Sequence, residues 1–178
     1  MSARRRVVTG HDAAGKSVFV SDEQLEPDTV ELFPGWAFLP VWGRDDTPTY
    51  PDDGSEPEWQ SYFPGVGGIR LSFSTIPPED TPPPPDDLDM QAAEAEVERA
   101  LPGLMAHMEP DDPGMHTTDT IDLEVMISGE VVLELDDGAE TVLRPGDTII
   151  QNGTRHRWRN RGSEPAVMAI FMLGAHRR

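Results

Sequence analysis

Short runs of alternating apolar and polar residues dominate the chain. Residues 69–76 alternate with a period of two, which predicts a strand. Shorter apolar runs of the same kind occupy 7–9, 17–20 and 36–42, and the residues between the first two have the composition of a hairpin turn. Beyond residue 114 the pattern predicts six more strands, over 120–128, 130–135, 139–143, 148–151, 155–160 and 166–173.

Two intervening segments lack this alternation. Residues 43–54 are rich in Asp, Pro and Thr and predict a loop. Residues 76–89 contain six prolines and five acidic residues, which favour an extended, exposed segment or a mobile loop.

One helix is predicted, over 87–101. Its apolar positions recur every three or four residues, at Met90, Ala93, Val97 and Leu101. Asp86 or Asp87 would cap its start, and the Pro-Gly pair that follows residue 101 would end it.

Turn signals at 136–138 and 144–147 separate several of the predicted strands. Short strands with this spacing indicate an all-β barrel or sandwich. The length of 178 residues fits one domain, which we divide into an N-terminal arm with strands and a Pro-rich loop (1–86), a helix and linker (87–113) and a motif region (114–178).

Composition narrows the classes of partner. The formal charge of −19 excludes nucleic acid and anionic membranes as expected partners, because phosphate binding needs a basic face. Cysteine is absent from the sequence, so disulfides and thiolate chemistry are excluded. No stretch approaches the roughly 18 apolar residues of a membrane span, and no apolar signal core follows the basic start. We therefore expect a cytoplasmic protein.

Two histidine-bearing segments carry the candidate chemistry. In the strand predicted over 120–128, Asp122 and Glu124 share one face, and His116 has the same parity. Two antiparallel segments can place His116, Asp122 and His156 around one point, and two imidazoles with one carboxylate are a minimal set for a divalent metal. The alternative is that the apolar face of this strand is the core and the acidic face is solvated.

The two segments resemble the two sequence motifs of the cupin superfamily. The first family motif is G-x5-H-x-H-x3,4-E-x6-G. Aligned on Gly129, His116 takes the first histidine position, Thr118 the second, and Asp122 the glutamate. The second motif, G-x5-P-x-G-x2-H-x3-N, is matched by Gly146, Gly153, His156 and Asn160, with Gln151 where proline is usual and one residue fewer before it. The resemblance covers about residues 114–173.

The resemblance implies a cupin β-barrel (double-stranded β-helix or jelly roll) with an N-terminal β arm and one outer helix. Strands of the arm would extend one sheet, and an unpaired edge there favours a homodimer.

The resemblance also implies a metal site. His116, Asp122 and His156 would hold one divalent ion, Fe, Mn, Ni or Zn. Thr118 is a poor ligand, so Asp119 or Glu124 could supply a fourth, or the site has lost its metal.

Further residues have possible roles near that site. Glu124 could be a general base or a surface carboxylate. Met126 and Trp158 could line the cavity and contact substrate, or could be ordinary core. Arg155, like its neighbour Arg157, could bind a substrate carboxylate or form a charged rim.

The sequence thus predicts a metal-dependent enzyme acting on a small organic acid or enolisable carbonyl compound, as an oxygenase, decarboxylase or isomerase. The alternative is a non-catalytic cupin that senses a small ligand. An epimerase that needs no metal would require an acid–base tyrosine, and only Tyr50 and Tyr62, both in loop-like sequence, are available.

Overall fold

The protein folds into three antiparallel sheets. The computed structural model describes residues 2–178. The strands are β1 (Arg4–His11), β2 (Ser17–Leu25), β3 (Ala37–Arg44), β4 (Ile69–Ile76), β5 (Thr120–Ser128), β6 (Val131–Glu134), β7 (Glu140–Leu143), β8 (Thr148–Asn152), β9 (Arg157–Arg159) and β10 (Ala166–Gly174). The helices are α1 (Met90–Ala100) and two short 3-10 helices, η1 (Leu104–His107) and η2 (Asp136–Gly138).

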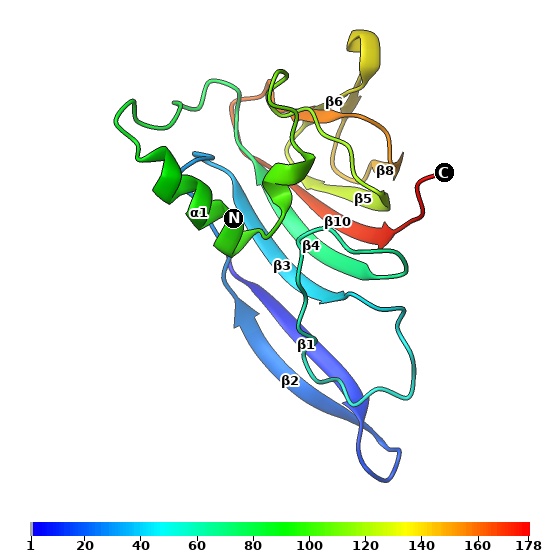
Figure 1. The fold of residues 1–178 in the computed structure, drawn as a ribbon. Helices are drawn as coiled ribbons and strands as arrows, with labels where there is room; N and C mark the ends of the chain where they lie inside the picture. The colour runs from blue at the N-terminus through cyan, green and yellow to red at the C-terminus, as the bar shows by residue number, and fades with distance from the viewer. Residues whose placement is uncertain (1) are drawn as a thin grey trace.

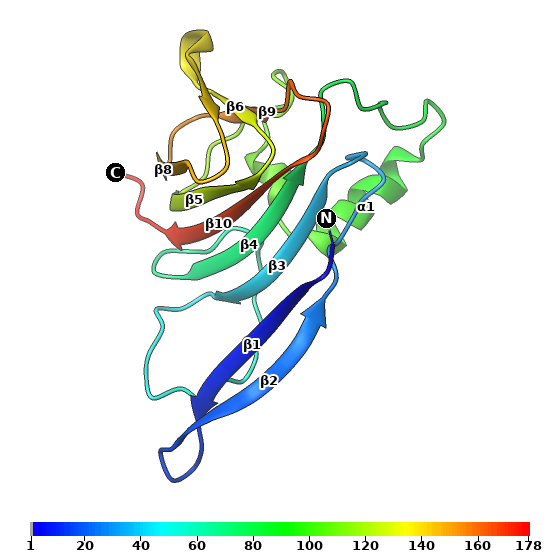
Figure 2. The same ribbon diagram turned by 180° about the vertical axis from the view of Figure 1, so that it is seen from behind.

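The strands form the two layers of a jelly roll with an added hairpin. One sheet has the order β3-β4-β10-β5-β8, and the other has the order β7-β6-β9. The β1-β2 hairpin is a separate sheet that lies beside β3, and α1 lies outside the strands (Figures 1 and 2). The predicted all-β fold with an N-terminal β arm and one outer helix is confirmed.

Two strands of the arm, β3 and β4, belong to the five-stranded sheet. The C-terminal strand β10 pairs with β4 on one side and with β5 on the other. Strands β3 and β4 of the arm therefore reach the motif region through β10, as predicted for strands that extend one sheet. In the described part of the chain, no helix has the length and apolar character needed to cross a membrane.

Most element boundaries agree with the alternation of the sequence. Strands β4 and β5 have the predicted bounds, whereas β1 and β2 are longer and η1 was not predicted. The prediction that Asp86 or Asp87 caps the helix is wrong: Asp89 caps it by accepting a hydrogen bond from the Ala92 amide at 3.1 Å. Met90 consequently lies at the first turn and is 51% exposed.

The acidic face of β5 points inward. Asp122 and Glu124 are 5% and 3% exposed, whereas Leu123 and Val125 on the opposite face are 45% and 37% exposed. The interpretation of Glu124 as a surface carboxylate is therefore wrong. Burying charged groups in place of available apolar ones is costly, so this orientation marks the interior of the jelly roll as a site.

Candidate functional site

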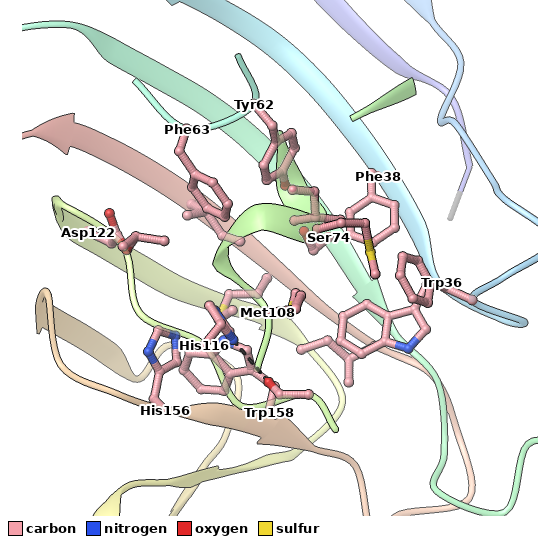
Figure 3. Close-up of a pocket in the computed structure, with 18 of the residues that line it drawn as sticks. Trp36, Phe38, Tyr62, Phe63, Ser74, Met108, His116, Asp122, His156 and Trp158 are labelled. Atoms are coloured by element: carbon pink, nitrogen blue, oxygen red, sulfur yellow. Dashed lines mark hydrogen bonds between the residues drawn. The ribbon is translucent and has the colours of Figure 1, made fainter. Parts of the chain in front are cut away.

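An apolar cavity of about 650 Å³ lies between the two layers. That volume falls within the range of small-molecule sites. Its walls come from β3, β4, β5, β9 and β10 and from the segment around η1 (Figure 3). The aromatic part of the lining consists of Phe33, Trp36, Phe38, Tyr62, Phe63 and Trp158.

Two histidines lie side by side on one wall of this cavity. The ring centroids of His116 and His156 are 4.2 Å apart, and their backbones form a two-way hydrogen-bonded bridge with both N–O distances at 3.0 Å. Gly153, which has a φ of 62°, allows the turn that brings His156 there. This pairing places two segments that are forty residues apart in the sequence at one point, as their motif positions predicted.

The hydrogen bonds of both rings define which nitrogen is free. Nδ1 of His116 lies 3.0 Å from the Gly114 carbonyl oxygen, and Nδ1 of His156 lies 2.8 Å from the Thr154 carbonyl oxygen. Because a carbonyl can only accept, each Nδ1 carries the proton and donates it, which leaves each Nε2 with a lone pair. Burial, and then the proximity of His116, lowers the pKa of His156 to about 4, so this ring is neutral at neutral pH.

Two carboxyl groups from β5 line the same cavity. Oδ1 of Asp122 and Oε2 of Glu124 are buried and have no hydrogen-bond partner in the protein. Burial raises the pKa of Asp122 to about 6. Burial, and then the charge of Asp122, raises the pKa of Glu124 to about 8. In Figure 3 Asp122 lies apart from the histidine pair, on the side toward Phe63.

The residues present fit a divalent metal in part. The two imidazole Nε2 atoms are suitable ligands, and each ring is oriented by a backbone carbonyl, as metal-binding histidines commonly are. However, residues 2–178 contain no group of three or more histidine, aspartate or glutamate side chains positioned to hold an ion. The predicted third ligand, Asp122, lines the cavity without joining the histidines, so the triad stays a prediction.

Three of the predicted site residues lie elsewhere. Asp119 pairs with Arg177 at 2.6 Å and is not part of the cavity lining, so the structure does not bring it to the two histidines. Met126 points inward but is fully buried in the core with residues such as Val131 and Leu133, and it is not part of the cavity lining. Arg155 is not part of the lining and is occupied by carboxylates of the protein itself, so it is not placed to bind a substrate. Trp158 lines the cavity, as predicted.

Ion pairs hold the segment that covers one side of the cavity. Arg155 donates two hydrogen bonds of 2.7 Å to Glu109, which lines the cavity, and one of 2.8 Å to Asp112. Arg157 binds the other oxygen of Asp112 at 2.7 Å. These arginines therefore position the chain between η1 and His116.

Sequence reasoning missed the residues that this segment and the arm contribute. Met105, Met108 and Glu109 line the cavity near η1, and Trp36 and Phe63 line it from the arm. Neither segment contains a motif, and the only available signal was the gathering of aromatic residues at 33–38 and 62–63.

Comparison with known proteins is informative for the second half of the chain. Residues 104–173 match a family described as the cupin domain, Cupin_2. Phomopsin biosynthesis cluster protein C' of Diaporthe leptostromiformis is 49% identical over 58 residues, which are 33% of this chain and 31% of that protein. The chain thus matches about a third of the length of that relative.

A longer match has lower identity. The cupin-domain-containing oxidoreductase srdB of Neurospora crassa is 26% identical over 173 residues, which cover 94% of this chain and 71% of that protein. Among solved structures, the Cnp3 cupin domain of Schizosaccharomyces pombe aligns with 98% of this chain and 88% of its own, with a TM-score of 0.48 and 8% identity.

Proposed function

Because residues 104–173 form a cupin domain, we propose that this protein is a metal-dependent cupin enzyme that acts on a small organic molecule in its apolar cavity. The observation that carries the proposal is the histidine pair, whose Nε2 lone pairs are both left free by Nδ1–carbonyl hydrogen bonds. An apolar cavity with a few polar groups at one point is the usual form of a site for such a molecule.

His116 and His156 would hold the metal, and the positions that they leave open would be available to substrate. A divalent ion there would supply Lewis-acid chemistry by polarising a substrate oxygen. Glu124 is the acid–base candidate, because its carboxyl group is buried in the cavity wall and one oxygen has no partner in the protein. The aromatic walls would exclude water and hold the apolar body of the substrate.

Of the two predicted substrate classes, the cavity favours an enolisable carbonyl compound over an organic acid. The described residues that line it include no lysine or arginine, and they include the carboxyl groups of Glu109, Asp122 and Glu124. A carboxylate would find no protein cation in this lining and would depend on the proposed metal alone for its compensating charge, whereas a neutral carbonyl compound needs no such compensation.

The relatives support an enzyme over a sensor. Three of them, from Neurospora crassa, Aspergillus ruber and Hypocrea virens, are named cupin-domain-containing oxidoreductases. Among the predicted oxygenase, decarboxylase and isomerase activities, this favours a redox reaction, as an oxygenase would perform.

Elemental analysis of the purified, untagged protein tests the metal site. We expect about one equivalent of Fe, Mn, Ni or Zn per chain in the wild type, and its loss in His116→Ala and in His156→Ala. His176→Ala is the matched control, because His176 is exposed in the C-terminal tail, and it should keep the metal. Metal absent after reconstitution, or retained in both site variants, contradicts the proposal.

A cavity of this size and polarity also suits ligand binding without turnover. Substrate consumption separates the two functions: a sensor would bind small apolar molecules stoichiometrically and leave them unchanged.

A further inference from the structure

The two buried carboxyl groups of β5 form a polar subsite distinct from the histidine pair. We define this carboxyl subsite as Asp122 and Glu124. Alternation along β5 places both on the inner face, two residues apart, and both line the cavity. Each is more than nine-tenths buried, and no group of three ligands joins them to the histidines among residues 2–178.

The subsite has unused capacity to accept hydrogen bonds. Oδ1 of Asp122 and Oε2 of Glu124 have no partner in the protein. Buried polar atoms are nearly always hydrogen-bonded, and leaving one without a partner costs about 1–3 kcal/mol. Two such atoms lie on one face of one strand and are open to the cavity. They therefore indicate that a ligand bound in the cavity supplies their missing partner.

In the structure of residues 2–178, no protein donor bonds either of these two oxygens. The hydroxyl groups of the lining are those of Tyr62, Ser74 and Thr118, and none of them bonds these oxygens. Thr118 is instead hydrogen-bonded to Thr120 at 2.7 Å. No lysine or arginine is part of the described lining. The remaining walls are aromatic and aliphatic.

We propose that the carboxyl subsite binds a hydrogen-bond donor of the substrate, a hydroxyl or amino group, carried on an apolar body that fills the aromatic part of the cavity. This inference rests on the proposed function in taking the cavity as the substrate site. It adds that the substrate presents an O–H or N–H donor to Asp122 and Glu124, in addition to any oxygen that the histidine side of the cavity receives. With both carboxyl groups ionised, a carboxylate or an ether, which only accepts, does not fit this subsite.

The test compares four probes with one hydrocarbon body: 3-phenylpropan-1-ol, 3-phenylpropan-1-amine, 3-phenylpropanoate and the methyl ether of the alcohol. Binding to the protein as purified is followed at pH 9, where both Asp122 and Glu124 are ionised, by titration calorimetry and by the fluorescence of Trp36 and Trp158, which line the cavity. We expect the alcohol or the amine to bind at least tenfold more tightly than both the ether and the carboxylate. A site built to bond a donor discriminates strongly against analogues that lack it.

The alcohol and the amine distinguish an uncharged donor from a cationic one, and preference for either supports the inference. Equal or tighter binding of the ether or the carboxylate overturns it, as does the absence of binding by all four probes.

Isosteric variants assign the effect to the subsite. Asp122→Asn and Glu124→Gln replace a carboxyl oxygen by an NH2 donor, so the preference for the alcohol or amine over the ether should fall severalfold in each. Glu94→Gln, at an exposed position of α1, makes the same change of charge and should leave the preference unchanged. An unchanged preference in both subsite variants overturns the assignment.

These readouts do not depend on turnover, and repeating them in His156→Ala removes the contribution of a bound metal to the binding of the carboxylate. A protein that binds no metal can still show the donor preference, and a metal enzyme can still fail to show it, so the two proposals succeed or fail separately.

Discussion

At the scale of single residues, the position of Gly129 combines a positive φ with a close backbone contact. Its φ is 73°, and a Cβ atom there would lie 2.6 Å from the Cα atom of Ala166, at the start of β10. Gly138 has a similar φ of 70° but open space around it. Substitution of each glycine by alanine therefore distinguishes the free-energy cost of backbone strain alone from the cost of strain together with a steric clash.

We predict that Gly129→Ala lowers the free energy of unfolding by more than Gly138→Ala does. Strain alone costs on the order of 1–3 kcal/mol, and only residue 129 adds a clash with backbone that cannot easily move. Urea unfolding of both variants measures the difference. Equal losses in the two would show that the close approach of Ala166 does not matter.

Glu134 is the residue whose ionisation should stabilise the fold at neutral pH. Its hydrogen bond from Arg157, and then that from Arg159, lower its pKa to about 2. A depressed carboxyl pKa contributes stability above the unfolded value of about 4.5, and this contribution is lost as the pH falls toward 2.

We accordingly predict that Glu134→Gln is less stable than the wild type at pH 6 and that the gap narrows progressively from pH 5 to pH 2. Melting temperatures across this range check it. For Glu94→Gln, at an exposed position of α1, the difference from the wild type should change little with pH. A gap that is constant or widens on acidification contradicts the role of the Arg157 pair.

At the scale of elements, the segment between η1 and His116 depends on its ion pairs. Arg155 is the residue that joins Glu109 and Asp112, and its side chain is 31% exposed. Bidentate arginine–carboxylate pairs provide fixed geometry as well as attraction.

We predict that Arg155→Met speeds amide hydrogen exchange in residues 108–115 and leaves exchange in β4 and β10 unchanged. Mass spectrometry of peptic fragments resolves these regions. Arg161→Met is the matched control, because Arg161 pairs with Glu140 outside this segment, and it should leave residues 108–115 protected. Unaltered exchange in Arg155→Met would mean that apolar contacts alone hold the segment.

The sequence predicted elements well because alternation along a strand is a local property. It could not predict which face of β5 points inward, since apolar and acidic residues alternate there and the choice depends on what the other sheet presents. The same limit applies to the site. The motif spacing predicted that His116 and His156 lie together. It could not predict that Asp119 pairs with Arg177 or that Arg155 pairs with Glu109, because these contacts join distant parts of the chain.

At the scale of the whole molecule, an unpaired strand edge and an exposed aromatic side chain favour the predicted homodimer. Within residues 2–178, strand β2 pairs only with β1, and its Phe19 is 81% exposed. An unpaired edge with a large apolar side chain favours pairing with another chain.

We predict that the protein sediments as a dimer at micromolar concentration and that Phe19→Ser weakens the dimer at least tenfold. Analytical ultracentrifugation over a concentration series measures both. Tyr50→Ser, which removes another highly exposed aromatic side chain from a loop, is the control and should leave the association unchanged. A wild type that is monomeric at all concentrations contradicts the prediction.

The place of β10 in the sheet has a consequence for how the protein is made. Strand β10 joins β4 to β5 and carries Met168, Ile170 and Met172 into the cavity wall. On the ribosome, β4 and β5 emerge well before residues 166–174, so the nascent chain has to keep two apolar strand edges unpaired until translation of this strand is complete. The cavity is therefore assembled only once β10 has joined β4 to β5.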